Sequence, residues 1–320
     1  MAEDRYSDLF VSASDGLRLY ARDYAGDIDA LPVVCLPGLA RTSADFHDLA
    51  AALAHDARKP RRVLALDYRG RGRSEYDPDW SHYDVRIELG DVLQVLIVAG
   101  VERAVFVGTS RGGLIAMALS AARPTLVAGV VLNDIGPVIE TRGLARIRSY
   151  VGKLPPPSDY AEAVEILKRL SGAQFPRLSD EEWRGLAQGG WRESDGRLVS
   201  NYDPALMKTL EALDLEAPVP PLWTLFQGLT AVPVLALRGS NSDILSAVTL
   251  GAMRQAYPAL QAVTVPDQGH APLLRGPDLI ERIRSFVARC EEMRSTRWVD
   301  GVVLEMNGGF RPEPAPDEAA

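Results

Sequence analysis

Residues 105–116 read Val-Phe-Val-Gly-Thr-Ser-Arg-Gly-Gly-Leu-Ile-Ala, a pattern of strand, sharp turn and helix. The first three residues are β-branched or aromatic, which is typical of a buried strand, and the apolar residues from Leu114 onward favour a helix. Gly108 and Gly112 flank Ser110, and their lack of side chains allows the strand and the helix to approach closely. The pattern predicts that Ser110 sits in a strained turn with its hydroxyl at a helix N-terminus, where free N–H groups favour negative charge.

This Gly-x-Ser-x-Gly turn resembles the nucleophile elbow of the α/β-hydrolase superfamily, which requires a strand before it and a helix after it. The alternative is the glycine-rich turn of a dinucleotide-binding fold, but the Gly-x-Gly-x-x-Gly phosphate fingerprint is absent from this turn. The resemblance implies that Ser110 is a nucleophile. It also implies a mostly parallel sheet flanked by helices, with a helical cap inserted into it.

Apolar runs elsewhere in the chain are consistent with that architecture. A turn sequence, Ser14-Asp15-Gly16, separates two runs that predict a hairpin. Continuous apolar strands alternate with helical segments, and this alternation predicts a parallel sheet covered on both faces. The expected strands are 8–13, 17–24, 31–36, 62–66, 105–107, 127–132, 232–237 and 260–265, and the expected helices are 43–55, 83–99, 245–257 and 278–293.

Strand–helix alternation stops between Pro137 and Phe226, where no strong buried strand is evident. We interpret residues 137–226 as a helical cap over the carboxyl edge of the sheet, and residues 1–136 with 227–295 as the α/β-hydrolase core. An independent helical domain without a role at the site is the alternative. The tryptophans and leucines of this segment favour an apolar pocket for an acyl or alcohol group, or else form the segment's own core.

Residues 296–320 are expected to form a C-terminal extension that is partly disordered, since its end is rich in proline and acidic residues. Residues 298–310 look like a strand followed by a turn and faintly resemble the closing strand of short-chain dehydrogenases. A phosphate-binding glycine-rich loop and a Tyr-x-x-x-Lys motif are missing, so we expect no oxidoreductase. Three alternatives stay open for this extension: it packs on the core, pairs with another subunit or stays unpacked.

Composition limits the partners of the protein. The chain has 320 residues and a formal net charge of −8, which argues against nucleic acid or an anionic membrane as a partner. Two cysteines, Cys35 and Cys290, do not make a disulfide framework, and neither a signal peptide nor a membrane-spanning run is evident. We therefore expect a cytoplasmic protein with a small-molecule substrate, possible homo-oligomers, and no cofactor or metal.

A serine hydroxyl needs a base to take its proton. His270 follows the last apolar strand in Gln-Gly-His-Ala-Pro, and an open α/β sheet places its site at the carboxyl ends of its strands. His270 is therefore the expected base of Ser110. His47, His55 and His82 fall in or next to predicted helices, where solvated or capping roles are expected.

The base needs a carboxylate that holds its tautomer. In the superfamily the acid stands between the serine and the histidine in the sequence, and two aspartates there follow apolar strands. The resemblance favours Asp243, which follows the strand ending at Leu237. Asp134, which follows the strand ending at Leu132, is the alternative, with a role at the hinge of the cap if Asp243 is the acid.

The resemblance also implies two backbone N–H groups that bind an oxyanion, namely those of Leu39 and Arg111. Relatives often have His-Gly where this chain has Pro37-Gly38, a departure that keeps the glycine of the turn. Residues 67–74, Asp-Tyr-Arg-Gly-Arg-Gly-Arg-Ser, resemble the superfamily's Asp-x-Arg-Gly-x-Gly-x-Ser loop. A phosphate or nucleic-acid patch is the alternative interpretation of these arginines, and the acidic net charge argues against it.

The expected reaction is hydrolysis of a carboxylic ester or lactone with a small to medium apolar substrate, through a Ser110–His270–Asp243 triad and an acyl-enzyme. Carbon–carbon hydrolysis of ring-cleavage products is an alternative, although those enzymes often carry Asn where this chain has Thr109. A cofactor-free haloperoxidase and a non-catalytic ligand receptor of the same fold also stay open. Epoxide hydrolases and haloalkane dehalogenases use an aspartate at the elbow, so Ser110 argues against both.

Overall fold

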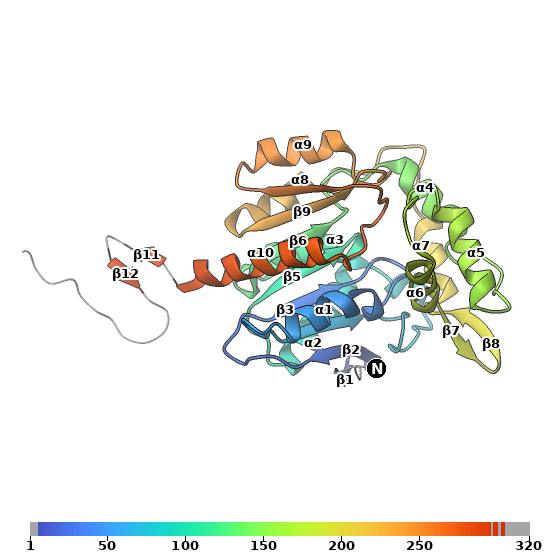
Figure 1. Ribbon diagram of the computed structural model, residues 1–320, viewed down its shortest axis with the longest axis horizontal. Helices are drawn as coiled ribbons and strands as arrows, with labels where there is room; N and C mark the ends of the chain where they lie inside the picture. Colours follow the sequence, from blue (N-terminus) through green and yellow to red (C-terminus); the bar gives the residue numbers. More distant parts are fainter. Residues whose placement is uncertain (1–5, 296, 300–301, 305–320) are drawn as a thin grey trace, which may run out of the picture.

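The computed structural model describes residues 6–295, 297–299 and 302–304, and within these residues an eight-stranded sheet forms the centre of the molecule (Figure 1). The strand order is β1-β2-β4-β3-β5-β6-β9-β10. β2 pairs antiparallel with both β1 and β4, and all pairings from β4 to β10 are parallel. The bounds are β1 Ser7–Ser12, β2 Arg18–Tyr24, β3 Val33–Leu36, β4 Val63–Asp67, β5 Ala104–Thr109, β6 Val127–Asn133, β9 Val234–Gly239 and β10 Gln261–Val265.

Helices cover both faces of this sheet. α2 (Val85–Val98), α3 (Arg111–Ala122) and α9 (Ala247–Ala256) share one hydrophobic core with the sheet, and α1 (His47–Ala54) and α10 (Pro277–Ser295) share the other. Residues of one strand alternate between the two cores, as β3 shows with Val34 in the first and Cys35 in the second. The expected mostly parallel sheet with helices on both faces is confirmed.

One predicted helix begins later than expected. Residues Ser43–Phe46 form a 3₁₀ turn, and α1 follows from His47. Thr42 is the N-cap of the turn, and its hydroxyl accepts a hydrogen bond from the Ala44 N–H at 3.4 Å.

Strand register brings distant segments to one edge of the sheet. Leu36 lies beside Gly108, and Thr109 lies beside Asn133. The loops that follow β3, β5 and β6 therefore emerge together at the carboxyl edge. A Cβ at Gly112 would overlap the backbone carbonyl of Leu36, so the close contact of α3 with β3 requires glycine there.

The segment between β6 and β9 contains five α-helices and a hairpin, and α4 to α7 lie together with the hairpin at one end of the sheet in Figure 1. The hairpin differs from the purely helical content that the sequence predicts. Each of its two strands has four residues, of which one is buried, so the sequence of the hairpin contains no buried apolar run. The elements are α4 Thr141–Tyr150, α5 Tyr160–Ser171, α6 Asp180–Gly190, β7 Trp191–Ser194, β8 Arg197–Ser200 and α7 Met207–Glu211.

The end of this segment packs differently from the rest. α8 (Trp223–Gln227) lies against α3, and Phe226 is fully buried in the first core together with Leu229. Trp223 packs on the same core, whereas Trp183 and Trp191 lie among the helices over the carboxyl edge. The chain thus returns to the core at α8.

Two short strands, Arg297–Val299 (β11) and Val302–Leu304 (β12), pair antiparallel beyond α10. The predicted strand at residues 298–310 falls partly on this pair, and its remainder lies outside the described residues together with the proline-rich end. Among the described helices, none combines the length and the apolar character that crossing a membrane requires.

Candidate active site

Ser110 occupies the turn between β5 and α3. Its backbone has φ 51° and ψ −112°, in the positive-φ region that side-chain-bearing residues rarely adopt. The Ser110 N–H donates to the Asn133 carbonyl at 3.0 Å, and the Ser110 carbonyl accepts from the Gly113 N–H at 2.9 Å. The strained turn predicted from the sequence is confirmed, and these bonds hold it in place.

His270 connects the serine to a carboxylate. Its Nε2 lies 2.9 Å from the Ser110 Oγ, and its Nδ1 lies 2.8 Å from the Asp134 Oδ2. The imidazole is 8% exposed and the Asp134 side chain is 0% exposed, so water competes little for these bonds. A base within hydrogen-bond reach of a hydroxyl, oriented by a third group, is the arrangement that activates a serine nucleophile.

Asp134 is held from two further sides. The Gly239 N–H donates to its Oδ1 at 2.8 Å, and the Ser242 hydroxyl donates to its Oδ2 at 2.5 Å. Each carboxylate oxygen therefore has a donor besides the histidine. These bonds fix the plane of the carboxylate and leave Oδ2 directed at the His270 ring.

The structure does not bring Asp243 to His270 as the acid, and that expectation is wrong. Asp243 forms a bidentate ion pair with Arg146 of α4, at 2.6 and 2.8 Å. Burial by itself raises the pKa of Asp243, but hydrogen bonds and charge from Arg146, helped by Gln174 and His270, hold this pKa below its usual value. Asp243 therefore links the β9 loop to the segment between β6 and β9.

Chain geometry explains this difference. Asp134 comes one residue after β6, and its N–H donates to the Leu237 carbonyl of β9 at 2.8 Å, so it stays at the level of the sheet edge. Asp243 comes four residues after β9 ends at Gly239 and has already left that edge. The loop after β9 contributes the Ser242 hydroxyl to the site instead.

The other three histidines lie elsewhere. The His47 Nδ1 lies 3.0 Å from the Tyr24 hydroxyl, and the His82 Nδ1 lies 2.9 Å from Asp77. His55 is the exposed C-cap of α1. Of the four histidines, all within residues 6–295, His270 is the one that contacts Ser110.

The two expected oxyanion donors lie beside the serine. A Cβ placed on Gly38 would be 3.9 Å from the Ser110 Cβ, so the Gly38–Leu39 peptide passes close to the hydroxyl. Arg111 directly follows Ser110 and opens α3. Within the described residues, the N–H groups of Leu39 and Arg111 donate to no protein acceptor. Both N–H groups are thus free to bind an oxygen near Ser110.

A cavity of about 220 Å³ opens next to Ser110 and His270. Its wall combines the carboxyl edge of the sheet with α4, α5, α6 and β7 and is mainly apolar. Arg41 and Asp45 also line it and form a bidentate pair at 2.5 and 2.7 Å. The apolar part of the wall is made by Phe46, Ile147, Val151, Leu154, Leu167, Leu170, Phe175, Trp183, Leu186, Trp191, Leu273 and Leu274.

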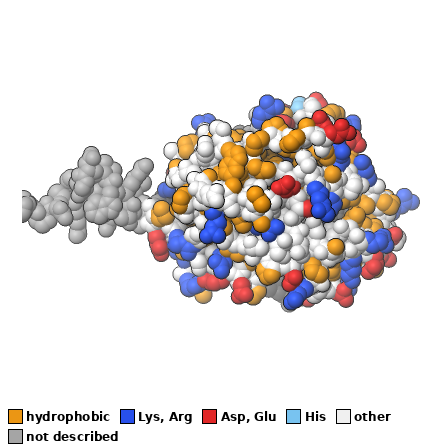
Figure 2. All heavy atoms as spheres, turned by 90° about the horizontal axis from the view of Figure 1, so that it is seen from above, with side chains coloured by type: hydrophobic (Ala, Val, Ile, Leu, Met, Phe, Trp, Pro, Cys, Tyr) orange, Lys and Arg blue, Asp and Glu red, His pale blue; other side chains and the backbone are white. Residues whose placement is uncertain are grey.

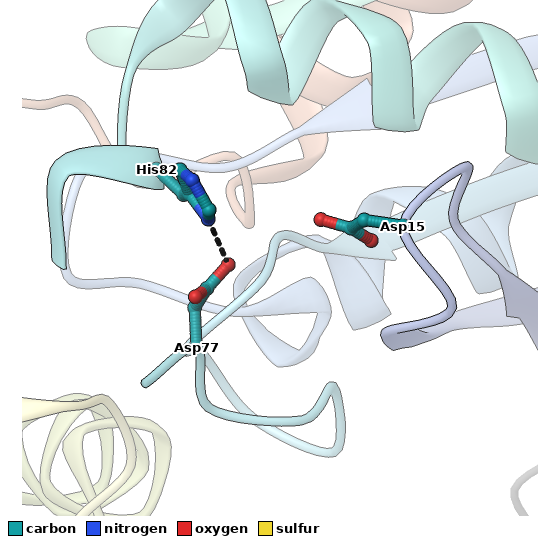
Figure 3. Close-up of side chains that lie close together, drawn as sticks. All are labelled: Asp15, Asp77 and His82. Atoms are coloured by element: carbon teal, nitrogen blue, oxygen red, sulfur yellow. Dashed lines mark hydrogen bonds and ion pairs between the residues drawn. The ribbon is translucent and has the colours of Figure 1, made fainter. Parts of the chain in front are cut away.

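A different set of side chains has the spacing of a metal site. Asp15, Asp77 and His82 have ligand atoms within 4.8 Å of one another, and Figure 3 shows Asp15 and His82 directed toward Asp77. The Arg69 guanidinium, however, donates to Asp15 at 2.8 Å and to Asp77 at 2.7 Å. This cluster already has its positive charge from Arg69, so its chemistry fits an arginine–carboxylate network better than a metal ion.

All three arginines of residues 67–74 form ion pairs. Arg69 is 1% exposed and Arg71 is 0% exposed, and both form ion pairs. Arg73 is half-exposed and pairs with Asp8. On the face drawn in Figure 2, basic and acidic side chains are interspersed. Two of the three arginines are thus buried and unavailable to phosphate, which gives Arg69 and Arg71 an internal role.

Sequence reasoning missed Glu88, which is buried beneath Arg71 and Arg111. A signal was present in α2, where Glu88 and Asp91 share the helical stripe of Val92 and Val95 that faces the core. Two acids on an apolar stripe, opposite a loop with three arginines, indicate buried ion pairs.

Comparison with known proteins gives consistent results. The family model described as "Alpha/beta hydrolase family" matches residues 33–283. The 3-hydroxybutyrate-oligomer hydrolase of Cupriavidus necator is 34% identical over 254 residues, covering 77% of this chain and 84% of that protein. The mouse (Mus musculus) sn-1-specific diacylglycerol lipase ABHD11 is 30% identical, covering 82% of this chain and 83% of that protein. The crystal structure of an alpha/beta hydrolase from Novosphingobium aromaticivorans has a TM-score of 0.82 at 41% identity, covering 90% of this chain and 100% of its own.

Proposed function

The chain belongs to the alpha/beta hydrolase family and is a hydrolase, and from this premise we propose that it cleaves carboxylic esters through an acyl-enzyme on Ser110. The observation that carries the proposal is the continuous contact from the Ser110 Oγ through His270 to Asp134, at 2.9 and 2.8 Å. A nucleophile, a base and an acid that orients the base, brought together from separate loops, form a catalytic triad.

Each member of the proposed triad has a defined role. His270 Nε2 takes the Ser110 proton as the Oγ attacks the ester carbonyl, and Asp134 stabilises the imidazolium through Nδ1–H. His270 then gives that proton to the departing alcohol, which leaves the acyl group on Ser110. A water molecule, deprotonated by His270, attacks the acyl-enzyme and releases the acid, and the proton returns to Ser110.

The tetrahedral intermediate carries a negative oxygen, and we assign its stabilisation to the N–H groups of Leu39 and Arg111. Both are free of protein acceptors among the described residues, and both belong to peptides next to Ser110. Donors that are held in place before reaction stabilise developing charge without reorganisation.

The cavity supports a small to medium substrate with an apolar acyl or alcohol group. Its volume of about 220 Å³ and its leucine-rich wall favour short to medium chains over bulky rings. Since α4, α5, α6 and β7 form much of that wall, we assign residues 137–226 the role of a cap that sets substrate size. The Cupriavidus relative is named for 3-hydroxybutyrate oligomers, so esters of short hydroxy acids are the first substrates to try.

The test is a panel of p-nitrophenyl esters from acetate to laurate, with a 3-hydroxybutyrate dimer, a lactone and a ring-cleavage dienoate in parallel. We expect turnover of short and medium esters by the wild type and none by Ser110→Ala. Turnover of the dienoate alone would favour carbon–carbon hydrolysis. Binding without turnover, unchanged by Ser110→Ala, would favour a receptor and contradict the proposal.

A further inference from the structure

The loop of residues 67–74 contacts the loop after β3 and carries Arg71, a buried cation that the proposed triad does not use. Arg71 is 0% exposed, and its ion pair with Glu88 of α2 measures 2.7 Å between Nη1 and Oε1. Removing charges from water is costly, and replacing a buried ion pair with apolar side chains is often neutral or stabilising. A buried pair is therefore weak evidence of a contribution to stability, and the contacts of Arg71 and Glu88 indicate a different role.

Arg71 reaches the loop that carries one oxyanion donor. Its Nε donates to the Leu39 carbonyl at 2.8 Å, and its Nη1 donates to the Arg69 carbonyl at 2.6 Å. The planar guanidinium thus clamps the β3 loop to residues 67–74 while its charge meets Glu88.

Glu88 continues the network toward the second donor. Its Oε2 accepts from the Arg111 Nε at 2.5 Å, and the Arg111 Nη2 donates to the Tyr83 carbonyl at 2.7 Å. Glu88 is 0% exposed, so both ion pairs are shielded from solvent. One carboxylate therefore connects the two arginines, and the chain of contacts runs from Leu39 to the residue after Ser110.

These contacts constrain the peptides that matter for an oxyanion. The Gly38 carbonyl belongs to the same peptide plane as the Leu39 N–H, and it accepts from the Arg41 N–H at 3.2 Å. The Arg71 bond fixes the next plane at the Leu39 carbonyl. With two consecutive planes held and the first residue of α3 tied to Glu88, little freedom is left to either N–H group.

We propose that Arg71 and Glu88 are positioning residues that hold the Leu39 and Arg111 N–H groups at a fixed separation, so that both bind the oxyanion. This inference rests on the proposed function. Neither Arg71 nor Glu88 lines the cavity. Both residues therefore affect catalysis only through the positions of the Leu39 and Arg111 N–H groups.

The test compares Arg71→Lys with Arg69→Lys. The two arginines share one loop and are both buried in ion pairs, but the Arg69 side chain binds Asp15, Asp77 and Asp91 and contacts neither donor residue. Lysine keeps the charge and loses the planar fork. Because deleting one oxyanion donor slows a serine protease by about 10²–10³-fold, we expect misplacement in Arg71→Lys to lower kcat by about 10–100-fold. KM should change less than about 3-fold, as a transition-state interaction is lost.

Two further readouts and a second variant distinguish a positioning role from a general loss of structure. In Arg71→Lys the pH profile of kcat/KM should keep the wild-type shape, because the triad is untouched. Hydrogen exchange in peptides covering residues 37–41 should be faster than in Arg69→Lys, which reports loop order independently of activity. If Arg71→Lys fails to fold, Arg111→Met serves as the second variant, because it breaks the ion pair with Glu88 at a side chain that is 13% exposed. Arg111→Met should also lower kcat.

Equal kcat in the two lysine variants, or losses that follow their losses in melting temperature, would overturn the inference. So would an unchanged kcat in Arg111→Met. A wild type that hydrolyses none of the esters would instead contradict the proposed function, and the exchange rates of residues 37–41 would still show whether Arg71 orders the loop.

Discussion

Asp134→Asn is the substitution that most sharply separates the two candidate acids. The Gly239 N–H donates to Oδ1 at 2.8 Å and cannot turn away, whereas the Ser242 hydroxyl at Oδ2 can rotate its hydrogen, so the asparagine oxygen takes the Oδ1 position. Its NH₂ group then takes the Oδ2 position, 2.8 Å from the His270 Nδ1. A donor at that position requires Nδ1 to accept, which puts the ring proton on Nε2.

In that tautomer His270 donates to Ser110 and cannot take its proton. Loss of the correct tautomer in a serine triad lowers kcat by about 10⁴-fold in the best-studied case, and we expect a loss of about 10³–10⁴-fold here, equivalent to about 4–5 kcal/mol of transition-state free energy. The side chains are nearly isosteric, so the cavity and the KM should change little.

The assay is steady-state hydrolysis of p-nitrophenyl butyrate by the wild type, Asp134→Asn and Asp243→Asn, each checked for folding by thermal denaturation. Asp243→Asn breaks the pair with Arg146 and should retain activity within about 5-fold, since it leaves the His270 contacts in place. A larger loss of kcat in Asp243→Asn than in Asp134→Asn would refute the reasoning and restore Asp243 as the acid.

Three further outcomes follow from single contacts. The pKa of Asp243 is lowered in the folded protein, so its ion pair stabilises the fold above the ordinary aspartate pKa of about 4 and loses this effect as the pH falls below it. In urea unfolding the wild type should therefore be about 1 kcal/mol more stable than Asp243→Asn at pH 7. This stability difference should shrink below about pH 4, and a difference that stays constant down to about pH 3 would contradict the reasoning. Arg41 lines the cavity, and Asp45 engages its Nε and Nη2 but not its Nη1. Arg41→Met should therefore raise KM about 10-fold for an anionic 3-hydroxybutyrate dimer and less for neutral p-nitrophenyl butyrate, whereas equal changes would exclude this preference. Gly112→Ala would drive a methyl group into the Leu36 carbonyl, and we expect at least about 2 kcal/mol of lost stability or no folded protein, with a wild-type melting temperature as the contrary result.

Local patterns were sufficient to predict the elements that carry Ser110 and His270. The glycines around Ser110 allow a turn that the backbone confirms with φ 51°, and the loop after β10 brings His270 to the same edge. These positions follow from rules that act within one strand–turn–helix unit.

The acid could not be identified in the same way, because Asp134 and Asp243 both follow apolar strands within one sheet. The choice depends on which loop stays at the sheet edge, and the hydrogen bond from the Asp134 N–H to the Leu237 carbonyl decides it. That bond joins neighbouring strands far apart in the chain. The hairpin of β7 and β8 was missed for a related reason, since its short, partly exposed strands lack a periodic signal.

The Arg71–Glu88–Arg111 network was beyond the sequence analysis because its three members come from three elements. Residues 67–74 were identified by their resemblance to a superfamily loop, but the partners of their arginines were not predicted. The structure shows the side chains of Arg69 and Arg71 buried against acids of α2. Pairing of buried charges depends on tertiary contacts, although the acids on the apolar stripe of α2 now offer a signal to look for in similar chains.

Labelling with an alkyl fluorophosphonate, followed by tryptic mass spectrometry, tests the central claim most directly. The probe is attacked only by an activated nucleophile, so the wild type should carry one phosphonate on Ser110, and His270→Ala should react at least about 10²-fold more slowly. Label on a different residue, or equal labelling rates in the wild type and His270→Ala, would contradict the mechanism.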